Sequence, residues 1–479
     1  MFTTTDLFGR FHSGRAPLKA ARDQIASSSL NGLSILLADW FPRWLLAPTE
    51  EGPNSRRRIY SLQVTFWTFL WQVLNPGQPC RQAVRKLIAW FKLRGLPPVD
   101  EEDSPYCQAR QRLPRQTLER ILQASAQAAE QRARQHWRFH GHEVKVGDGT
   151  TVLVPDTAPN QHAYPQSARQ APGCGFPLLK LVALFSLTSG ALLAVVTGNK
   201  HRAELALFRR LWRQLQAGDI FLADRGFCDY VTVVALKLFG VDSVLRLNGS
   251  RPHDFRRGRR LGRYDRLVTW EKPRRQPRTV SKKQWRDLPV DFTLRLLSYP
   301  VCIPGFRATK IFLVTTLVDP KEYPVAELAG LYLRRWRVEL FLRHLKTTLQ
   351  MERLSCKSPA MVHKELLLHL IAYNLIRCVM VEAAGIYEVD LEQLSFKGAL
   401  DTVREFCPAL LQARNQAQRL GLMNTLLSTL AHYPLPVRPH RVEPRVQKKR
   451  PKAFPFLCQP RQKLKARLLH SKNPIKYRP

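Results

Sequence analysis

Acidic residues are scarce in this sequence: 37 Asp and Glu stand against 76 Lys and Arg, a formal net charge of +39 over 479 residues. A surplus of this size favours polyanionic partners. Nucleic acid is the commonest such partner; an anionic membrane surface and a ribosome-like structural role are the alternatives. The apolar fraction of 44% is ordinary and argues against a disordered basic chain. We therefore expect a globular protein that binds nucleic acid.

The sequence also lacks a paired-cysteine motif. Its nine cysteines are odd in number and scattered, and no two of them form a C-x-x-C pair. This pattern argues against a disulfide framework and against a cysteine zinc site, and it favours reduced thiols. We therefore expect a cytoplasmic protein.

Long hydrophobic runs are absent as well. The best candidate, "LLLHLIAYNLIRCVM" (366–380), is shorter than the roughly 20 apolar residues of a membrane span and contains polar groups. We expect it to be a buried helix. The N-terminal "MFTTTDLFGRFHSGR" has no apolar region of the kind that secretion signals contain. The sequence thus predicts no membrane partner.

The pattern of residues along the chain changes near residue 143. Before it the sequence is helical in character, with helix formers throughout 116–140. After it apolar β-like runs alternate with helical segments, which is typical of an α/β layered domain. The expected strands cover 143–154, 177–187, 191–198, 219–226, 242–247 and 310–317, and the expected helices cover 202–216 and 229–239. A basic, β-leaning stretch at 248–309 interrupts this alternation, and 434–479 reads as a flexible basic tail.

Two Asp residues fall at expected ends of neighbouring strands. Asp148 lies in "KVGDGTT" and Asp224 lies in "FLADRGF". A carboxylate at the end of a buried strand is costly unless something compensates it. A turn Asp is the ordinary explanation for either residue alone, but two such acids on neighbouring strands favour a shared site.

The segment "YLRRWRVELFLRHLK" (332–346) combines a helical period with six basic residues and a single acid, Glu339. At about 100° per residue, Tyr332, Arg335 and Lys346 lie within roughly 40° of Glu339 on one helix face. Apolar residues flank this stripe, so we expect it to be set into the protein. The alternative is a solvated face with an Arg–Glu pair worth about 0.2–0.5 kcal/mol.

Three carboxylates brought together would repel one another. At about 4 Å and an effective dielectric near 20, each pair costs about 4 kcal/mol. Oxygen ligands with open positions suit Mg²⁺ or Mn²⁺, and two such ions can support phosphoryl transfer. We therefore predict Asp148, Asp224 and Glu339 as catalytic metal ligands, with Tyr332, Arg335 and Lys346 binding the DNA and positioning its phosphates.

The same segments resemble a known family. Tyr332, Arg335, Glu339 and Lys346 match the Y-x2-R-x3-E-x6-K signature of bacterial insertion-sequence DDE transposases, the IS-four group. "DGTTVLVPDT" and "LADRGF" look like that family's first and second Asp motifs. "WEKPRRQP", "LVTTLVDPKEYP" and "LLHLIAYNLIR" are similar to its sequences too, and the resemblance covers about residues 100–400.

The resemblance implies an α/β fold in which an RNase H-like mixed sheet, flanked by helices, is interrupted by a β-rich insertion and preceded by a helical N-terminal domain. The expected segments are a helical DNA-binding domain at 1–140, a catalytic core in two parts at 141–247 and 310–400, the basic insertion at 248–309, and a C-terminal helical segment with a basic tail at 401–479.

The resemblance also implies a function. It indicates cut-and-paste transposition through hairpin ends, with two Mg²⁺ or Mn²⁺ ions, double-stranded DNA ends and target DNA as partners, and a homodimer that pairs the two ends. It places the protein with the bacterial nucleoid. The alternatives are a catalytically inactive DNA-binding relic or regulator, and an RNase H-like nuclease that cuts without joining.

Further residues are weaker DNA-binding candidates. Arg246 ends an expected strand before the insertion and could meet a phosphate. The insertion contains Trp270, Trp285, Tyr299 and Phe306, any of which could stack on a displaced base or belong to the core of a small sheet.

Residues beside the expected acids are weaker still. His201 and Glu204 in "HRAE" could neighbour the metals or simply begin a helix. Thr150 and Arg225 adjoin the acids and could support them. Tyr373 and Asn374 are expected to pack or hydrogen-bond within the helix at 366–380.

Overall fold

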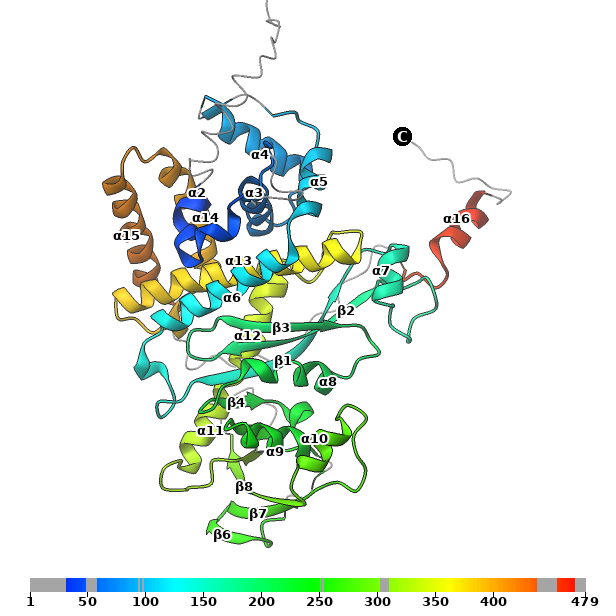
Figure 1. Cartoon of the computed structure of the whole chain (residues 1–479), viewed down its shortest axis with the longest axis vertical. Coiled ribbons are helices and arrows are strands. Elements are labelled where there is room, and N and C mark those ends of the chain that lie inside the picture. The colour runs from blue at the N-terminus through cyan, green and yellow to red at the C-terminus, as the bar shows by residue number, and fades with distance from the viewer. Residues whose placement is uncertain are drawn as a thin grey trace, which may run out of the picture. The chain divides into compact units, whose positions relative to one another are not determined.

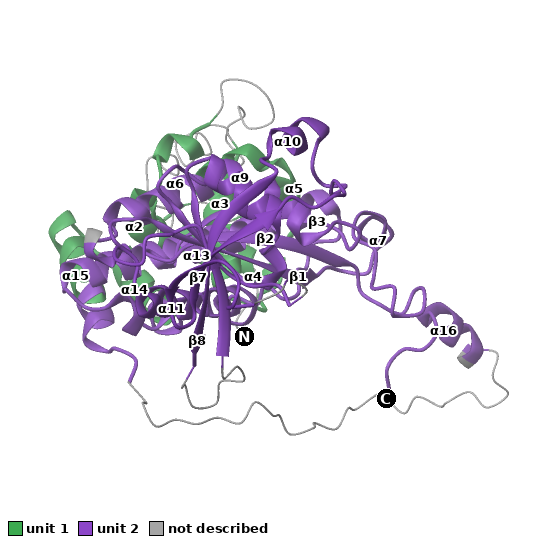
Figure 2. Cartoon of the chain, turned by 90° about the horizontal axis from the view of Figure 1, so that it is seen from below, with its two compact units in different colours: residues 1–121, 400–426 green, residues 122–399, 427–479 purple. Residues whose placement is uncertain are grey.

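The structure is a computed structural model that describes residues 32–48, 58–93, 95–96, 99–249, 251, 254–301, 310–436 and 455–469. The described residues divide into two compact units, one within residues 1–121 and 400–426 and the other within residues 122–399 and 427–479 (Figure 2). The boundaries of the five segments expected from the sequence remain a prediction.

The described residues of the first unit are helical. Its elements are α2 (Gly32–Leu37), η1 (Ala38–Trp40), η2 (Arg43–Leu46), α3 (Leu62–Leu74), α4 (Cys80–Leu93), α5 (Ser104–Arg112), and parts of α6 (Arg115–Arg132), α14 (Phe396–Gln412) and α15 (Gln416–His432). Ser61 caps α3 by accepting a hydrogen bond from the Val64 amide at 3.2 Å. The buried rings of Phe66 and Trp67 on α3 anchor its core.

The helix expected over 116–140 is shorter than predicted. α6 ends at Arg132, and only the 3-10 turn η3 (Gln135–Trp137) follows. The chain then reverses at His140 and Gly141, both with positive φ, and Phe139 bridges to His142. The helix ends early because this reversal leads the chain into the first strand.

A mixed sheet of nine strands organises the second unit (Figure 1). The strands are β1 (Val144–Leu153), β2 (Leu178–Ser186), β3 (Leu192–Gly198), β4 (Ile220–Ala223), β5 (Asp242–Arg246), β6 (Arg259–Gly262), β7 (Asp265–Glu271), β8 (Asp291–Pro300) and β9 (Lys310–Thr315). Their order is β3-β2-β1-β4-β5-β9-β8-β7-β6, with β1, β4 and β5 parallel and the other pairs antiparallel. This confirms the expected RNase H-like mixed sheet.

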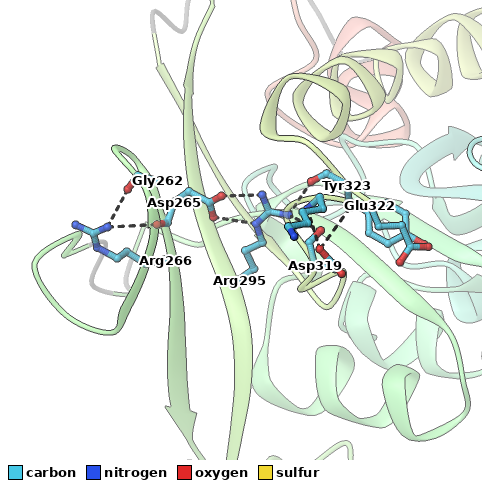
Figure 3. Close-up of polar contacts among 8 residues, drawn as sticks. Gly262, Asp265, Arg266, Arg295, Asp319, Glu322 and Tyr323 are labelled. Carbon is cyan, nitrogen blue, oxygen red and sulfur yellow. Dashed lines mark hydrogen bonds and ion pairs between the residues drawn. The ribbon is translucent and has the colours of Figure 1, made fainter.

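The strands of the predicted insertion extend this same sheet. β8 pairs with β9 along six residues, and β7 and β6 follow outward. A fully buried guanidinium secures the extension, because Arg295 of β8 donates to both carboxylate oxygens of Asp265 at 2.8 and 2.7 Å. Arg295 also donates to the Tyr323 carbonyl at 2.7 Å (Figure 3). One side chain thus joins β7, β8 and the loop after β9.

Helices pack on the sheet of this unit. They are α7 (Ala158–Ala163), α8 (Glu204–Arg209), α9 (Tyr230–Leu238), α10 (Lys282–Asp287), α11 (Val325–Arg334), α12 (Arg337–Arg343) and α13 (Pro359–Ile386), with the 3-10 turns η4 (Trp212–Gln214), η5 (Arg225–Phe227) and η7 (Leu391–Gln393). α8 contacts β2 and β3, and α12 contacts β1. The helix expected over 202–216 is in fact broken into α8 and η4. Phe208 turns inward there and stacks on Phe221 of β4 at 4.5 Å.

α13 contains the apolar segment that we expected to be a buried helix. Among the described helices it is the one long and apolar enough to cross a membrane, yet 94% of its most apolar window is buried inside the protein. Tyr373 donates to the Gly190 carbonyl at 2.7 Å, and the Asn374 amide bonds both backbone groups of Leu192. These two residues therefore fasten α13 to the β2–β3 hairpin, whereas we expected bonds within the helix.

Most of the predicted flexible tail, including 437–454 and 470–479, lies outside the described residues. The part that is described forms the helix α16 (Arg461–Leu469), which carries four basic residues. Pro460 precedes it and lies close to Gly173 in the loop between α7 and β2. The contact of this tail with nucleic acid remains a prediction.

Candidate active site

The register of two parallel strands sets Asp148 and Asp224 at the same level. Val146 of β1 pairs with Leu222 of β4, and each Asp lies two residues beyond that pair. Neighbouring strands lie about 4.8 Å apart, so the two carboxylates belong to one end of the β1–β4 pair. Asp224 follows the last residue of β4, as predicted, and accepts a hydrogen bond from the Arg225 amide at 2.7 Å.

The placement of Asp148 at a strand end was wrong. Asp148 lies inside β1 and pairs with Ala183 of β2. β1 outlasts its pairing with β4 because its antiparallel ladder with β2 continues to Leu153. At Asp148, β1 is therefore paired with β2 on one edge. On its other edge the neighbouring strand β4 has already ended.

The segment 332–346 is not one regular helix. α11 ends at Arg334, α12 begins at Arg337, and a π-helical turn, η6, covers His344–Thr348. The backbone between α11 and α12 is tightly wound, since the Glu339 amide bonds the Trp336 carbonyl three residues back, at 3.1 Å. A constant 100° per residue therefore does not fix the direction of Lys346, which lies half-buried in the π turn.

Arg335 connects two of the three predicted acids. Its guanidinium is 5% exposed, with Nη1 4.0 Å from Asp148 Oδ2 and Nη2 donating to Glu339 Oε1 at 3.4 Å. The Glu339 side chain is 47% exposed. The expected stripe is therefore buried at Arg335 and opens to solvent at Glu339.

Tyr332 connects the third acid to this group. Its ring is buried, and burial raises the pKa of its hydroxyl. The charges of Arg335 and Arg246 lower that pKa, and the charge of Asp224 raises it, so these side chains surround the hydroxyl. Tyr332 Oη and Arg335 Nε are buried and have no hydrogen-bond partner within the described chain.

The electrostatics of Asp148 reflect its crowded position. Burial raises its pKa to about 6, and the negative charges of Glu204 and Glu339 add to the effect. The Gly149 amide, which donates to Asp148 Oδ1 at 2.8 Å, and the Arg335 cation act in the opposite direction. A cation placed against this carboxylate would therefore stabilise its ionised form.

The described residues contain no group of three His, Cys, Asp or Glu side chains already close enough to hold a metal ion. Arg335 lies between Asp148 and Glu339 instead and supplies the positive charge there. Two of the three predicted acids, Asp148 and Glu339, thus lie around one guanidinium.

The aromatic candidates of the insertion differ in exposure. Trp270 is 8% exposed, belongs to the hydrophobic core and lies under Arg251, whose Cζ is 3.9 Å from the ring centroid. Trp285 is half-buried, and the Lys272 ammonium lies 4.8 Å from its ring. Tyr299 is half-buried, and Phe306 lies outside the described residues.

Sequence reasoning gave too little weight to two residues near the acids. Arg246 of β5 lies close enough to influence the Tyr332 hydroxyl. Glu204 of α8 influences Asp148 more strongly than Glu339 does. The sequence offered Glu204 as one of two residues in "HRAE" that could neighbour the metals, and the structure brings Glu204 against Gly149.

Comparisons with known proteins identify the family of the chain. Residues 139–375, which include every acid and base of the site, match the family described as the transposase DDE domain. The chain is 30% identical over 458 residues to the transposase InsG for insertion sequence element IS4 of Escherichia coli (strain K12), covering 94% of this chain and 96% of that protein. A solved piggyBac transposase synaptic complex with hairpin DNA is also similar, at 11% identity over 88% of this chain and 85% of that one, with a TM-score of 0.40.

Proposed function

Because the chain belongs to the IS4 family of DDE transposases, we propose that it moves its element by nicking each DNA end, forming a hairpin, reopening it and joining the end to a target. The protein is a DNA-cleaving and strand-transferring enzyme that depends on divalent metal and acts on DNA. The level register of Asp148 and Asp224, with Glu339 held beside Asp148 by Arg335, is the observation that carries the detailed proposal.

Asp148, Asp224 and Glu339 would hold the metal, Mg²⁺ or Mn²⁺, as two ions. The donor set fits, because all three groups offer the hard carboxylate oxygens that these ions prefer. Burial and like charge destabilise the Asp148 anion, which a divalent cation would reverse. The bound ions supply Lewis-acid stabilisation of the charge that develops on the attacking and leaving oxygens.

The basic side chains of the site would bind the scissile phosphate. Arg335 can donate to phosphate oxygens from a buried position. Among the described residues the Tyr332 hydroxyl makes no hydrogen bond of ordinary geometry, although Arg335 lies beside it, and it can donate one hydrogen bond to a phosphate oxygen. Lys346 and Arg246 add positive charge from the π turn and from the end of β5.

The reaction is then a series of in-line displacements at phosphorus. Water attacks the phosphodiester at the element's end, the bond from phosphorus to O3′ breaks, and a 3′-hydroxyl is released. That hydroxyl attacks the phosphodiester of the opposite strand, the O3′ of the flanking DNA leaves, and a hairpin forms. A second water attacks the hairpin phosphodiester, and the element's own O3′ leaves as a hydroxyl. The regenerated 3′-hydroxyl finally attacks a target phosphodiester, and the target's own O3′ leaves.

Hairpin formation requires a sharply bent end, which is easier if one base leaves the stack. An aromatic ring that stacks on the base would stabilise this state by about 1–3 kcal/mol. Trp285 is the better candidate because it is only partly buried at the edge of the core and a cation lies beside it. The Trp270 ring is buried, so it would have to leave the core to serve.

The remaining features of the proposal concern the oligomeric state and the cellular location of the protein. Joining two ends in one event requires two active sites, so we propose a homodimer in the complex with both DNA ends. The net charge of +39 supports binding along the DNA backbone beyond the active site. A cytoplasmic, nucleoid-associated location accords with these partners.

The test is a reaction with the DNA that flanks the protein's own gene. End-labelled duplex is incubated with the full chain and a target plasmid, with Mg²⁺ or with a chelator. Denaturing gels should show nicked, hairpin and joined products with Mg²⁺ alone. Cleavage without joining would favour a nuclease, and binding without cleavage would favour an inactive relic.

A further inference from the structure

The carboxylate of Glu204 lies directly against the backbone that carries Asp148. If Gly149 had a side chain, its first carbon would be placed 1.5 Å from Glu204 Oε1 and 2.4 Å from Cδ. Real contacts never approach so closely, so the Glu204 carboxylate occupies the place of the missing side chain. Glycine at this position of β1 is what allows a fourth acid to reach the site.

The electrostatic influence of Glu204 follows from this position. Its carboxylate contacts Gly149, the residue that directly follows Asp148 in β1. An exposed acid at the start of α8 would ordinarily interact with the helix N-terminus alone. Contact with Gly149 brings it to Asp148 instead, where a neighbouring anion is unfavourable unless a cation joins the group.

Buried donors facing the same site indicate that a ligand is missing. Arg335 is 5% exposed and points at Asp148, yet its Nε has no hydrogen-bond partner in the described chain. The Tyr332 hydroxyl is 3% exposed and equally unpartnered. An unsatisfied buried polar group requires an explanation, and a bound water, ion or ligand is one of them. The acids offer oxygens to a cation, and these donors offer hydrogens to an anion such as a phosphate.

We propose that Glu204 is a fourth carboxylate of the metal site, providing an oxygen ligand beside Asp148. This inference rests on the proposed function of Asp148, Asp224 and Glu339. It adds a residue from α8 to a set drawn from β1, β4 and α12.

Binding of Mn²⁺ tests the inference without relying on activity. Free Mn²⁺ is followed by electron paramagnetic resonance in titrations of the full chain bound to end duplex. Glu204→Gln should weaken binding at least tenfold, and Gly149→Ala should do the same because its methyl group displaces the carboxylate. The control Glu271→Gln removes an exposed acid from β7 and should leave the affinity unchanged.

The results of these titrations distinguish a failure of this inference from a failure of the proposed function. If Asp148→Asn and Glu339→Gln weaken Mn²⁺ binding while Glu204→Gln binds like the wild type, Glu204 is not a ligand and the triad stands. If all of these variants bind normally, the triad itself is wrong. Glu204 is exposed, so Glu204→Gln should fold, and thermal unfolding without metal checks this. Should Gly149→Ala fail to fold, Glu204→Gln alone decides.

Discussion

Replacing Arg295 by Met should destabilise the extension of the sheet severely. The side chain is fully buried and makes two hydrogen bonds to Asp265, at 2.8 and 2.7 Å, and one to the Tyr323 carbonyl at 2.7 Å. Methionine has a side chain of similar length but carries no charge and donates no hydrogen bond. The substitution therefore leaves the Asp265 carboxylate, itself 4% exposed, without its cation (Figure 3).

The magnitude follows from the cost of an uncompensated buried charge. Breaking a buried ion pair by removing one partner costs about 3–5 kcal/mol, against a total stability of about 5–15 kcal/mol for a typical domain. Each 1.4 kcal/mol is a factor of ten in an equilibrium constant. Arg295→Met should thus raise the population of locally opened β7 and β8 by a factor of at least about 100.

Hydrogen–deuterium exchange measures this opening directly. Peptides that cover β7 and β8 should exchange at least about 100-fold faster in Arg295→Met than in the wild type. Adding Asp265→Leu should restore most of the protection, because an apolar pair avoids the buried charge. Arg132→Met breaks the partly exposed pair with Glu382 and should cost less than about 1 kcal/mol. Exchange within threefold of wild type in Arg295→Met would refute the reasoning.

Three further outcomes are expected. Tyr332→Phe removes a hydroxyl that makes no hydrogen bond of ordinary geometry within the described residues, so thermal unfolding should change little while strand transfer on gels falls about tenfold; equal transfer would show that the hydroxyl does not touch DNA. Deleting 441–479 removes thirteen Lys or Arg and one Glu, so the slope of log affinity for random duplex against log salt should flatten, and an unchanged slope would mean that the tail does not contact DNA. Trp285→Ala should lower the ratio of hairpin to nick with first nicking intact, whereas Trp270→Ala should mainly lower stability; a wild-type ratio in both variants would remove stacking by these two rings as the means of bending the end.

The sequence predicted the sheet and its acids because both depend on short-range patterns. Apolar β-like runs marked all of the core strands, and the spacing of Tyr332, Arg335 and Glu339 marked the site. The two motifs indicated that Asp148 and Asp224 lie on neighbouring strands. They did not indicate that β1 continues beyond Asp148. Whether a strand stops or continues depends on its partner, and β2 carries β1 past Asp148.

The features that sequence reasoning missed depend either on local departures from a regular helical period or on tertiary contacts. A uniform helical period cannot reveal the tight turn at Arg335 or the π turn that contains Lys346, since both are local departures from that period. The burial of Trp270 depends on a core assembled from distant segments. The approach of Glu204 to Gly149 joins two elements 55 residues apart along the chain, and no local pattern encodes it.

The assignment of the three acids is tested most directly by comparing cleavage with binding. Asp148→Asn, Asp224→Asn and Glu339→Gln are assayed on labelled end duplex with Mg²⁺, and end binding is measured in parallel by gel shift. Binding should persist because it derives mainly from Lys and Arg. Nicking by each variant should fall below detection, since each lacks a metal ligand. Nicking at near the wild-type rate by any one of them would contradict its place in the triad.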